Sequence, residues 1–119
     1  MKSLLIRLTH GLYDQDIASA ERELVAQWYG MKLLTFIDGK YQFSTQYRAG
    51  IVSLAQTSGA YLQTIGESIR DHFIDTTQLM GAKNGDLVIA QRLLGKRGGP
   101  SAKVILIVGR SETFSVALL

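Results

Sequence analysis

The sequence predicts an α+β chain, in which a short helical segment with a β-hairpin precedes a small five-stranded antiparallel β-barrel. The hydrophobic period changes from helical to alternating near Leu34, and β-prone runs separated by turn residues continue from there to residue 108. The pair Asp38-Gly39 between two such runs favours a tight hairpin. A length of 119 residues allows one ordinary domain or two very small ones, and 46% hydrophobic residues is normal for a folded chain.

A first helix is predicted over residues 2–10, because Leu4, Leu5 and Leu8 repeat there at helical spacing, and it should stop at Gly11. A second helix is expected to begin after a capping residue, either Asp16 or Ser19, and to end near Gly30. Its buried stripe would consist of Leu24, Val25, Trp28 and Tyr29.

The hairpin consists of the β-prone runs 33–37 and 41–45 around Asp38-Gly39, two residues that tolerate the positive φ of a two-residue turn. Two helices followed by a tight hairpin predict a reduced winged-helix-like domain over residues 1–46.

The second part is expected to form a barrel over residues 47–111. Five strands with a short helical turn between the third and the fourth, here near Leu79, are the layout of an OB-type barrel. The expected strands cover residues 48–55, 60–65, 70–75, 86–94 and 102–108. The apolar run 114–119 would either begin a following domain, within residues 112–119, or add a strand to an edge of the barrel.

The net charge of +3 lies entirely in the second part of the chain, residues 46–119. Five basic and five acidic residues precede Gln46, whereas eight basic and five acidic residues follow from Gln46 onward. A polyanion would therefore bind the barrel part, although an excess of three charges is also compatible with an ordinary surface.

Several classes of protein are disfavoured by composition. The chain has no cysteine, and its longest apolar run, 104–108, is far shorter than the ~20 residues that cross a bilayer. No signal-peptide core is recognisable at the N-terminus. These features predict a cytoplasmic protein without a membrane partner.

The sequence contains no recognisable catalytic motif. His10 and His72 lie in different segments, and the spacings of zinc-protease, nucleophile-elbow and Walker motifs are missing. Asp71, Asp75 and Asp86 could be considered as a two-metal carboxylate cluster, but turn chemistry after Asn84-Gly85 explains Asp86 more simply. We predict no active site in these residues.

The pattern of aromatic and basic residues indicates that the chain binds single-stranded nucleic acid. Phe73 is a candidate for base stacking, because strand alternation would turn His72 and Ile74 inward, although a core position is equally common for Phe. Tyr61 should face outward, because Leu62 suits the core, but a one-residue slip would exchange the two faces. Candidate phosphate contacts are Arg48, Arg70, Lys96, Arg97 and Lys103. His72 could be a satisfied histidine at the barrel end, a stacking partner or a base contact.

A family resemblance covers nearly the whole chain. Taken in order, the following segments resemble the N-terminal region of the exoribonuclease R family: Gly39–Phe43, Ala49–Val52, Asp71–Ile74, Gly85–Val88 and Ala102–Ile107. One departure is that family members usually carry a glycine-flanked pair of aromatics on the second barrel strand, whereas this chain has Gly59-Ala60-Tyr61-Leu62-Gln63.

The resemblance implies a helix-turn-helix domain followed by cold-shock-type OB domains and a catalytic domain that degrades RNA from its 3′ end. The chain would then be the single-stranded RNA-binding region of a 3′-to-5′ exoribonuclease, and Phe73 would lie on the RNA-facing surface. RNA would be presented to a catalytic domain outside this chain, which would contact this region and hold a divalent metal such as Mg²⁺. No cofactor is expected in the chain itself, and residues 114–119 would begin the second cold-shock domain.

Two alternatives remain open. A winged-helix DNA-binding regulator would read the major groove with Arg22, Gln27 and Lys32 and place Lys40 in the wing, although acidic residues near the helix start disfavour phosphate docking. A protein-interaction module without nucleic-acid binding would use a contact patch of Tyr41, Phe43, Tyr47 and Phe114.

Overall fold

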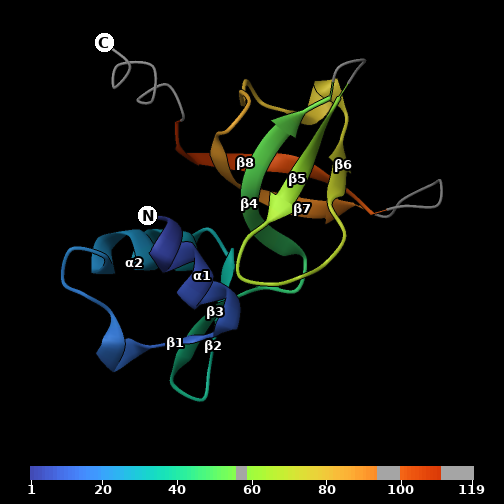
Figure 1. Ribbon diagram of the computed structural model, residues 1–119. Helices are drawn as coiled ribbons and strands as arrows, with labels where there is room; N and C mark the ends of the chain where they lie inside the picture. Colours follow the sequence, from blue (N-terminus) through green and yellow to red (C-terminus); the bar gives the residue numbers. More distant parts are fainter. Residues whose placement is uncertain (56–58, 94–99, 111–119) are drawn as a thin grey trace, which may run out of the picture.

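The computed structural model describes residues 1–55, 59–93 and 100–110. It confirms the predicted α+β fold class, with a helical part that precedes a closed barrel (Figure 1). The helical part comprises α1 (Lys2–His10), β1 (Leu12–Tyr13), the 3₁₀ turn η1 (Asp14–Asp16), α2 (Arg22–Gly30), β2 (Leu34–Ile37) and β3 (Lys40–Phe43). The barrel part comprises β4 (Tyr47–Leu54), β5 (Ala60–Thr64), β6 (His72–Ile74), the 3₁₀ turn η2 (Thr76–Gln78), β7 (Leu87–Leu93) and β8 (Ser101–Gly109).

The first helix has the predicted bounds, and the predicted leucines Leu4, Leu5 and Leu8 are buried. It ends at Gly11, whose φ of 107° lies in the region that favours glycine and whose N–H donates to the Arg7 carbonyl at 2.9 Å.

The second helix begins later than predicted, and neither Asp16 nor Ser19 caps it. Its N-cap is Glu21, and Asp16 belongs to η1 instead. The Glu21 carboxylate accepts a hydrogen bond from the Ala18 N–H at 3.3 Å and pairs with both terminal nitrogens of Arg7, at 3.1 and 2.6 Å. This bidentate pairing lowers the pKa of Glu21 and joins the start of α2 to α1.

The hairpin forms at the predicted turn. Asp38 and Gly39 have φ values of 54° and 79°, as a type I′ turn requires. The sequence analysis missed β1, which pairs with β3 through Leu12 and Tyr41. The resulting sheet has the order β1-β3-β2.

The five predicted barrel strands are confirmed, with the order β4-β5-β6-β8-β7 around a closed ring. One pair corrects the antiparallel prediction, because β6 and β8 run parallel through Phe73 and Ser101. The other four neighbouring pairs are antiparallel. A closed ring with an odd number of strands cannot alternate direction throughout, so one parallel pair is unavoidable.

Two hydrophobic clusters hold the chain together. The first fills the barrel and consists of Val52, Ala60, Leu62, Ile74, Ala82, Val88, Ala90, Ala102 and Val104. The second, which we call the shared core, combines residues of the helical part with residues on the outside of the barrel. Its helical-part members include Leu5, Leu8, Val25, Trp28, Leu33 and Phe43, and its barrel-part members are Ala49, Ile65 and Ile89.

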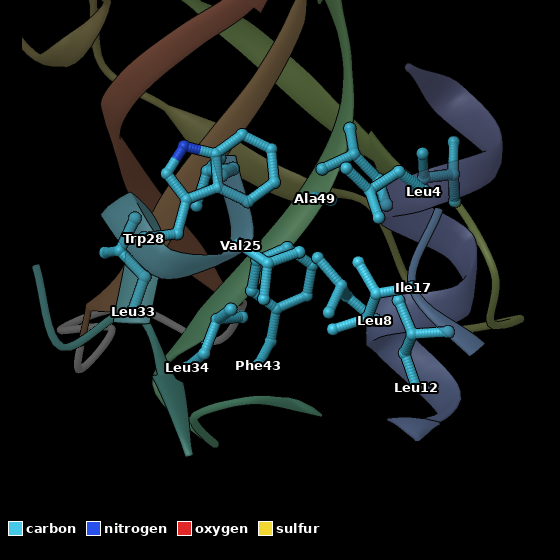
Figure 2. Packing of buried hydrophobic residues seen from close by; sticks show 13 residues of the cluster. Leu4, Leu8, Leu12, Ile17, Val25, Trp28, Leu33, Leu34, Phe43 and Ala49 are labelled. Atoms are coloured by element: carbon cyan, nitrogen blue, oxygen red, sulfur yellow. The ribbon is translucent and has the colours of Figure 1, made fainter. Parts of the chain in front are cut away.

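The shared core places the helical part against β4 and β7. Ala49 and Ile89 are direct partners across these strands, and both are buried although they lie outside the barrel. Figure 2 shows Ala49 of β4 close to the side chains of α1 and α2. The strands β5 and β6 contribute no residue to this cluster between Ala60 and Thr64 or between His72 and Ile74. Among the described residues, the shared core therefore does not cover the outer face of these two strands.

Within the described residues no helix is long and apolar enough to cross a membrane. The domain boundary at residue 46 stays a prediction. The possible domain start at 112–119 lies outside the described residues.

Leu8→Ala should lower the free energy of unfolding by about 2–5 kcal/mol, because it removes a fully buried side chain from the shared core. Trp28 fluorescence and far-UV circular dichroism should shift together in urea, since Trp28 belongs to the same cluster. Ile69→Ala, at an exposed position, serves as the control and should change stability by less than about 0.5 kcal/mol. Separate transitions for the two signals would show that the two parts unfold independently.

Candidate nucleic-acid interface

An exposed aromatic pair lies on the open face of β5 and β6. Tyr61 and Phe73 are direct partners across these strands, and their ring centroids are 5.7 Å apart at an interplanar angle of 70°. Tyr61 is 44% exposed and Phe73 is 37% exposed, which confirms the predicted outward orientation of both. Large aromatic faces open to solvent are the feature on which unpaired bases stack.

Gly59 supports the position of the Phe73 ring. It has a φ of 76°, and a Cβ atom at this residue would lie 2.7 Å from Cε1 of Phe73 and 2.9 Å from the Ile74 carbonyl oxygen. Only glycine therefore leaves room for the ring so close to the backbone. The sequence contained this glycine next to the strand, but its contact with Phe73 depends on the strand register.

Two serines extend the aromatic pair into a row across the barrel. Ser53 is the partner of Tyr61, and Ser101 is the partner of Phe73 and also of Leu93. The start of β8 is held to this row by a 2.9 Å hydrogen bond from the Phe73 N–H to the Pro100 carbonyl. Both serines are partly exposed and belong to a surface that the sequence analysis did not identify.

His72 does not belong to this surface. It is only 4% exposed and points into the barrel, so a direct contact with a base or a stacked ring is excluded for the folded chain. Burial lowers the pKa of His72, and the nearby positive charges of Arg48 and Arg92 lower it further, against a hydrogen bond with the Arg70 backbone and the charge of Glu67. Its Nδ1 has no hydrogen-bond partner among the described residues.

Arg48 is engaged by the protein itself. Its guanidinium donates to the carbonyl oxygens of Thr45 and Tyr47 at 2.8 Å, and its Nε lies 3.5 Å from Glu67. The side chain is 20% exposed. Phosphate binding would have to compete with these contacts, so Arg48 is a weaker candidate than the sequence suggested.

The remaining candidates differ in position. Arg70 is exposed just before β6, and Lys103 follows Ser101 by two residues on β8, on the same face of the strand. Neither forms an ion pair in the part of the chain that the structure describes. Lys96 and Arg97 lie outside the described residues.

Two of the three aspartates considered for a metal cluster have structural contacts. Asp75 accepts hydrogen bonds from the N–H and hydroxyl of Thr77, which lower its pKa and cap η2. Asp86 is buried and binds the Lys83 N–H at 2.8 Å and Arg110 at 3.0 Å. In residues 1–55, 59–93 and 100–110, no group of three acidic, histidine or cysteine side chains could hold a metal ion.

A closed five-stranded barrel in this strand order, preceded by two helices and a small sheet, defines an OB-type α+β chain. The sequence profile of the family described as "Ribonuclease R, OB first domain, N-terminal" matches residues 3–103, and the chain belongs to this family. The resemblance found in the sequence is thereby confirmed.

Among solved structures, the apo form of Mycoplasma genitalium RNase R is similar to the chain, with 25% sequence identity and a TM-score of 0.49. The match covers 53% of this chain and 10% of that chain, so the match spans about a tenth of the length of that structure. No curated protein sequence shows a significant match.

Gly59→Ala should destabilise the chain by about 2 kcal/mol or more, because the added Cβ collides with the Phe73 ring in addition to straining the backbone. Gly81→Ala is the matched control, since Gly81 has a φ of 79° with no atom within 4 Å of the added Cβ. The difference between the two variants in the free energy of unfolding, measured in urea, would give the cost of the collision with Phe73 apart from the cost of backbone strain. Equal losses of stability would contradict a packing role for Gly59.

His72 should make the chain less stable as the pH falls below about 6.5, the ordinary pKa of histidine. Its pKa is lowered in the folded state, so the unfolded chain binds more protons between the two pKa values, and stability is lost as pH falls through that window. His72→Leu should flatten this part of a pH series of urea midpoints. His10→Gln, at the exposed end of α1, should keep it, and an unchanged slope in His72→Leu would refute the assignment.

Proposed function

We propose that this chain is the single-stranded RNA-binding N-terminal region of a 3′-to-5′ exoribonuclease, and that RNA binds on the outer face of β5 and β6. The main support for this proposal is the exposed pair of Tyr61 and Phe73, which are direct partners on neighbouring strands. Membership of the ribonuclease R family supports RNA as the ligand.

The basic residues near this face would follow the RNA backbone. Lys103 lies on β8 beside the row that contains Phe73, and Arg70 lies just before β6. Lys96 and Arg97 are proposed as additional phosphate contacts, because their segment joins Leu93 to Ser101 at the ends of the same row. Phosphate contacts of this kind make binding dependent on salt.

Hydrolysis would take place in a catalytic domain of a longer protein, where a divalent metal such as Mg²⁺ would act. This chain would deliver RNA to that domain and would not cut it. A cytoplasmic location also stays a prediction.

The DNA-binding alternative is less well supported. Arg22, one of its predicted base readers, contacts the Asp14 carboxylate at 3.3 Å and the Asp14 carbonyl at 3.0 Å, and Glu21 lies at the start of the same helix.

Fluorescence anisotropy with labelled single-stranded RNA, single-stranded DNA and duplex DNA across a salt series tests the proposal. Tyr61→Ala and Phe73→Ala should each weaken binding of single-stranded RNA about 5-fold to 150-fold, because one stacked base contributes about 1–3 kcal/mol. Tyr13→Ala is the matched control, since Tyr13 is similarly exposed but lies on the small sheet. Its affinity should stay within about twofold of the parent chain.

Three outcomes would contradict the proposal or a part of it. Unchanged affinity in folded Tyr61→Ala and Phe73→Ala variants would remove the aromatic pair from the interface. Preference for duplex DNA would favour the helical part as the main site, and a salt slope unaltered by Lys96→Ala with Arg97→Ala would remove those two residues.

A further inference from the structure

The open edge of the small sheet carries a second interaction surface. In the order β1-β3-β2, strand β2 pairs with β3 on one side and has no strand on its other side among the described residues. Edge strands are usually protected by charged residues, proline or a bulge. The four residues of β2, Leu34-Thr35-Phe36-Ile37, contain no charged residue and no proline.

The hydrogen bonding determines which backbone groups this edge presents. The Ser44 N–H donates to the Leu33 carbonyl at 3.0 Å, so this carbonyl points toward β3, whereas the Leu33 N–H donates to the Trp28 carbonyl at 3.0 Å. Because these groups alternate in direction along an antiparallel strand, Thr35 also faces β3, and Leu34 and Phe36 direct their N–H and C=O groups to the open edge. Two donors and two acceptors are thus available for another strand.

An apolar groove accompanies the edge. It has a volume of about 550 Å³ and is lined by Tyr29, Gly30 and Lys32 at the end of α2 and by residues 34–37 of β2. Tyr29, Phe36 and Ile37 are among the most exposed large hydrophobic residues of the chain. The Tyr29 and Phe36 rings both contact Tyr41, so the wall of the groove is a packed aromatic cluster.

Two opposite charges flank the edge symmetrically. Lys32 lies three residues before Thr35, and Asp38 lies three residues after it. Both are exposed, and neither forms an ion pair within the described ranges. Both residues lie in turns just beyond the ends of β2, with φ values of 66° and 54°, so an antiparallel copy of β2 centred on Thr35 would bring each Lys32 to the same end of the pair as an Asp38 of the other copy.

We propose that two copies of this chain pair antiparallel through β2, with Thr35 of one copy opposite Thr35 of the second copy. In this register Leu34 lies opposite Phe36 of the second copy, so the outward backbone groups of both residues form hydrogen bonds in reciprocal pairs. The Phe36 ring of each copy enters the groove of the other beside Leu34 and Gly30. Lys32 and Asp38 form an ion pair at each end, and the two sheets become one sheet of six strands.

This pairing leaves the barrel surface open. In Figure 1, β2 lies at the end of the helical part, well separated from β5 and β6. The dimer would therefore present two separate copies of the Tyr61 and Phe73 face, and dimer formation can be tested without RNA.

Thr35→Cys provides the decisive experiment, because the chain has no other cysteine. At the centre of the proposed pair the two residues are directly opposite without mutual hydrogen bonds, with a Cα separation of about 4.5 Å that permits a disulfide. Mild oxidation should give a disulfide-linked dimer on non-reducing gels. Gln15→Cys, at an exposed position on η1, is the matched control and should not become disulfide-linked on the same gels.

Sedimentation equilibrium of the unmodified chain up to about 1 mM should show a monomer–dimer equilibrium. Lys32→Asp alone and Asp38→Lys alone should each weaken dimerisation at least about tenfold, because each places like charges opposite one another. An equimolar mixture of the two variants should restore it, since every facing pair is then oppositely charged. Lys2→Asp, the same charge change at the start of α1, should leave the equilibrium unchanged.

A chain that remains monomeric up to this concentration would overturn the proposal. A dimer that neither forms the Thr35→Cys disulfide nor responds to Lys32→Asp would overturn it as well, because association would then use another surface.

Discussion

The shared core between the helical part and the outer face of β4 and β7 is the constraint on which the rest of the structure depends. Barrel strands usually alternate between buried and exposed residues, but β7 contains the continuous run Val88-Ile89-Ala90, all of it buried. Val88 and Ala90 fill the barrel, whereas Ile89 joins Trp28 and Leu8 outside it. Covering one side of the barrel in this way leaves the opposite side, β5 and β6, as the surface available to a ligand.

Much of the fold could be predicted because local patterns carry it. The leucine spacing of α1 and the turn residues Asp38 and Gly39 act over a few residues, and the structure has both where the sequence places them. The start of α2 could not be predicted, because Glu21 is recruited by Arg7 from another helix. Strand β1 was missed because two residues have no period, and it exists only through its pairing with β3.

In the candidate site too, local patterns predicted some features, whereas others depend on contacts between segments that are distant in the sequence. The alternation of residues along β5 and β6 was enough to predict that Tyr61 and Phe73 face outward and that His72 faces inward. The presence of Ser53, Gly59 and Ser101 beside them follows from registers between distant strands, which one-dimensional patterns do not contain. The contacts of Arg48 with Glu67 and the carbonyl oxygens of Thr45 and Tyr47 are equally long-range or conformation-dependent. A basic residue in a suitable position is therefore not the same as a free cation.

The parallel pairing of β6 with β8 has a consequence for how such a surface can vary. Leu93 and Ser101 are partners across β7 and β8, and Ser101 is also the partner of Phe73, so the last residue of β7 and the first residue of β8 lie side by side. Residues inserted or deleted between these two positions would leave every strand register intact. The positions of Tyr61 and Phe73 are set by the pairing of β4, β5, β6 and β8, and these registers do not depend on the number of residues between Leu93 and Ser101.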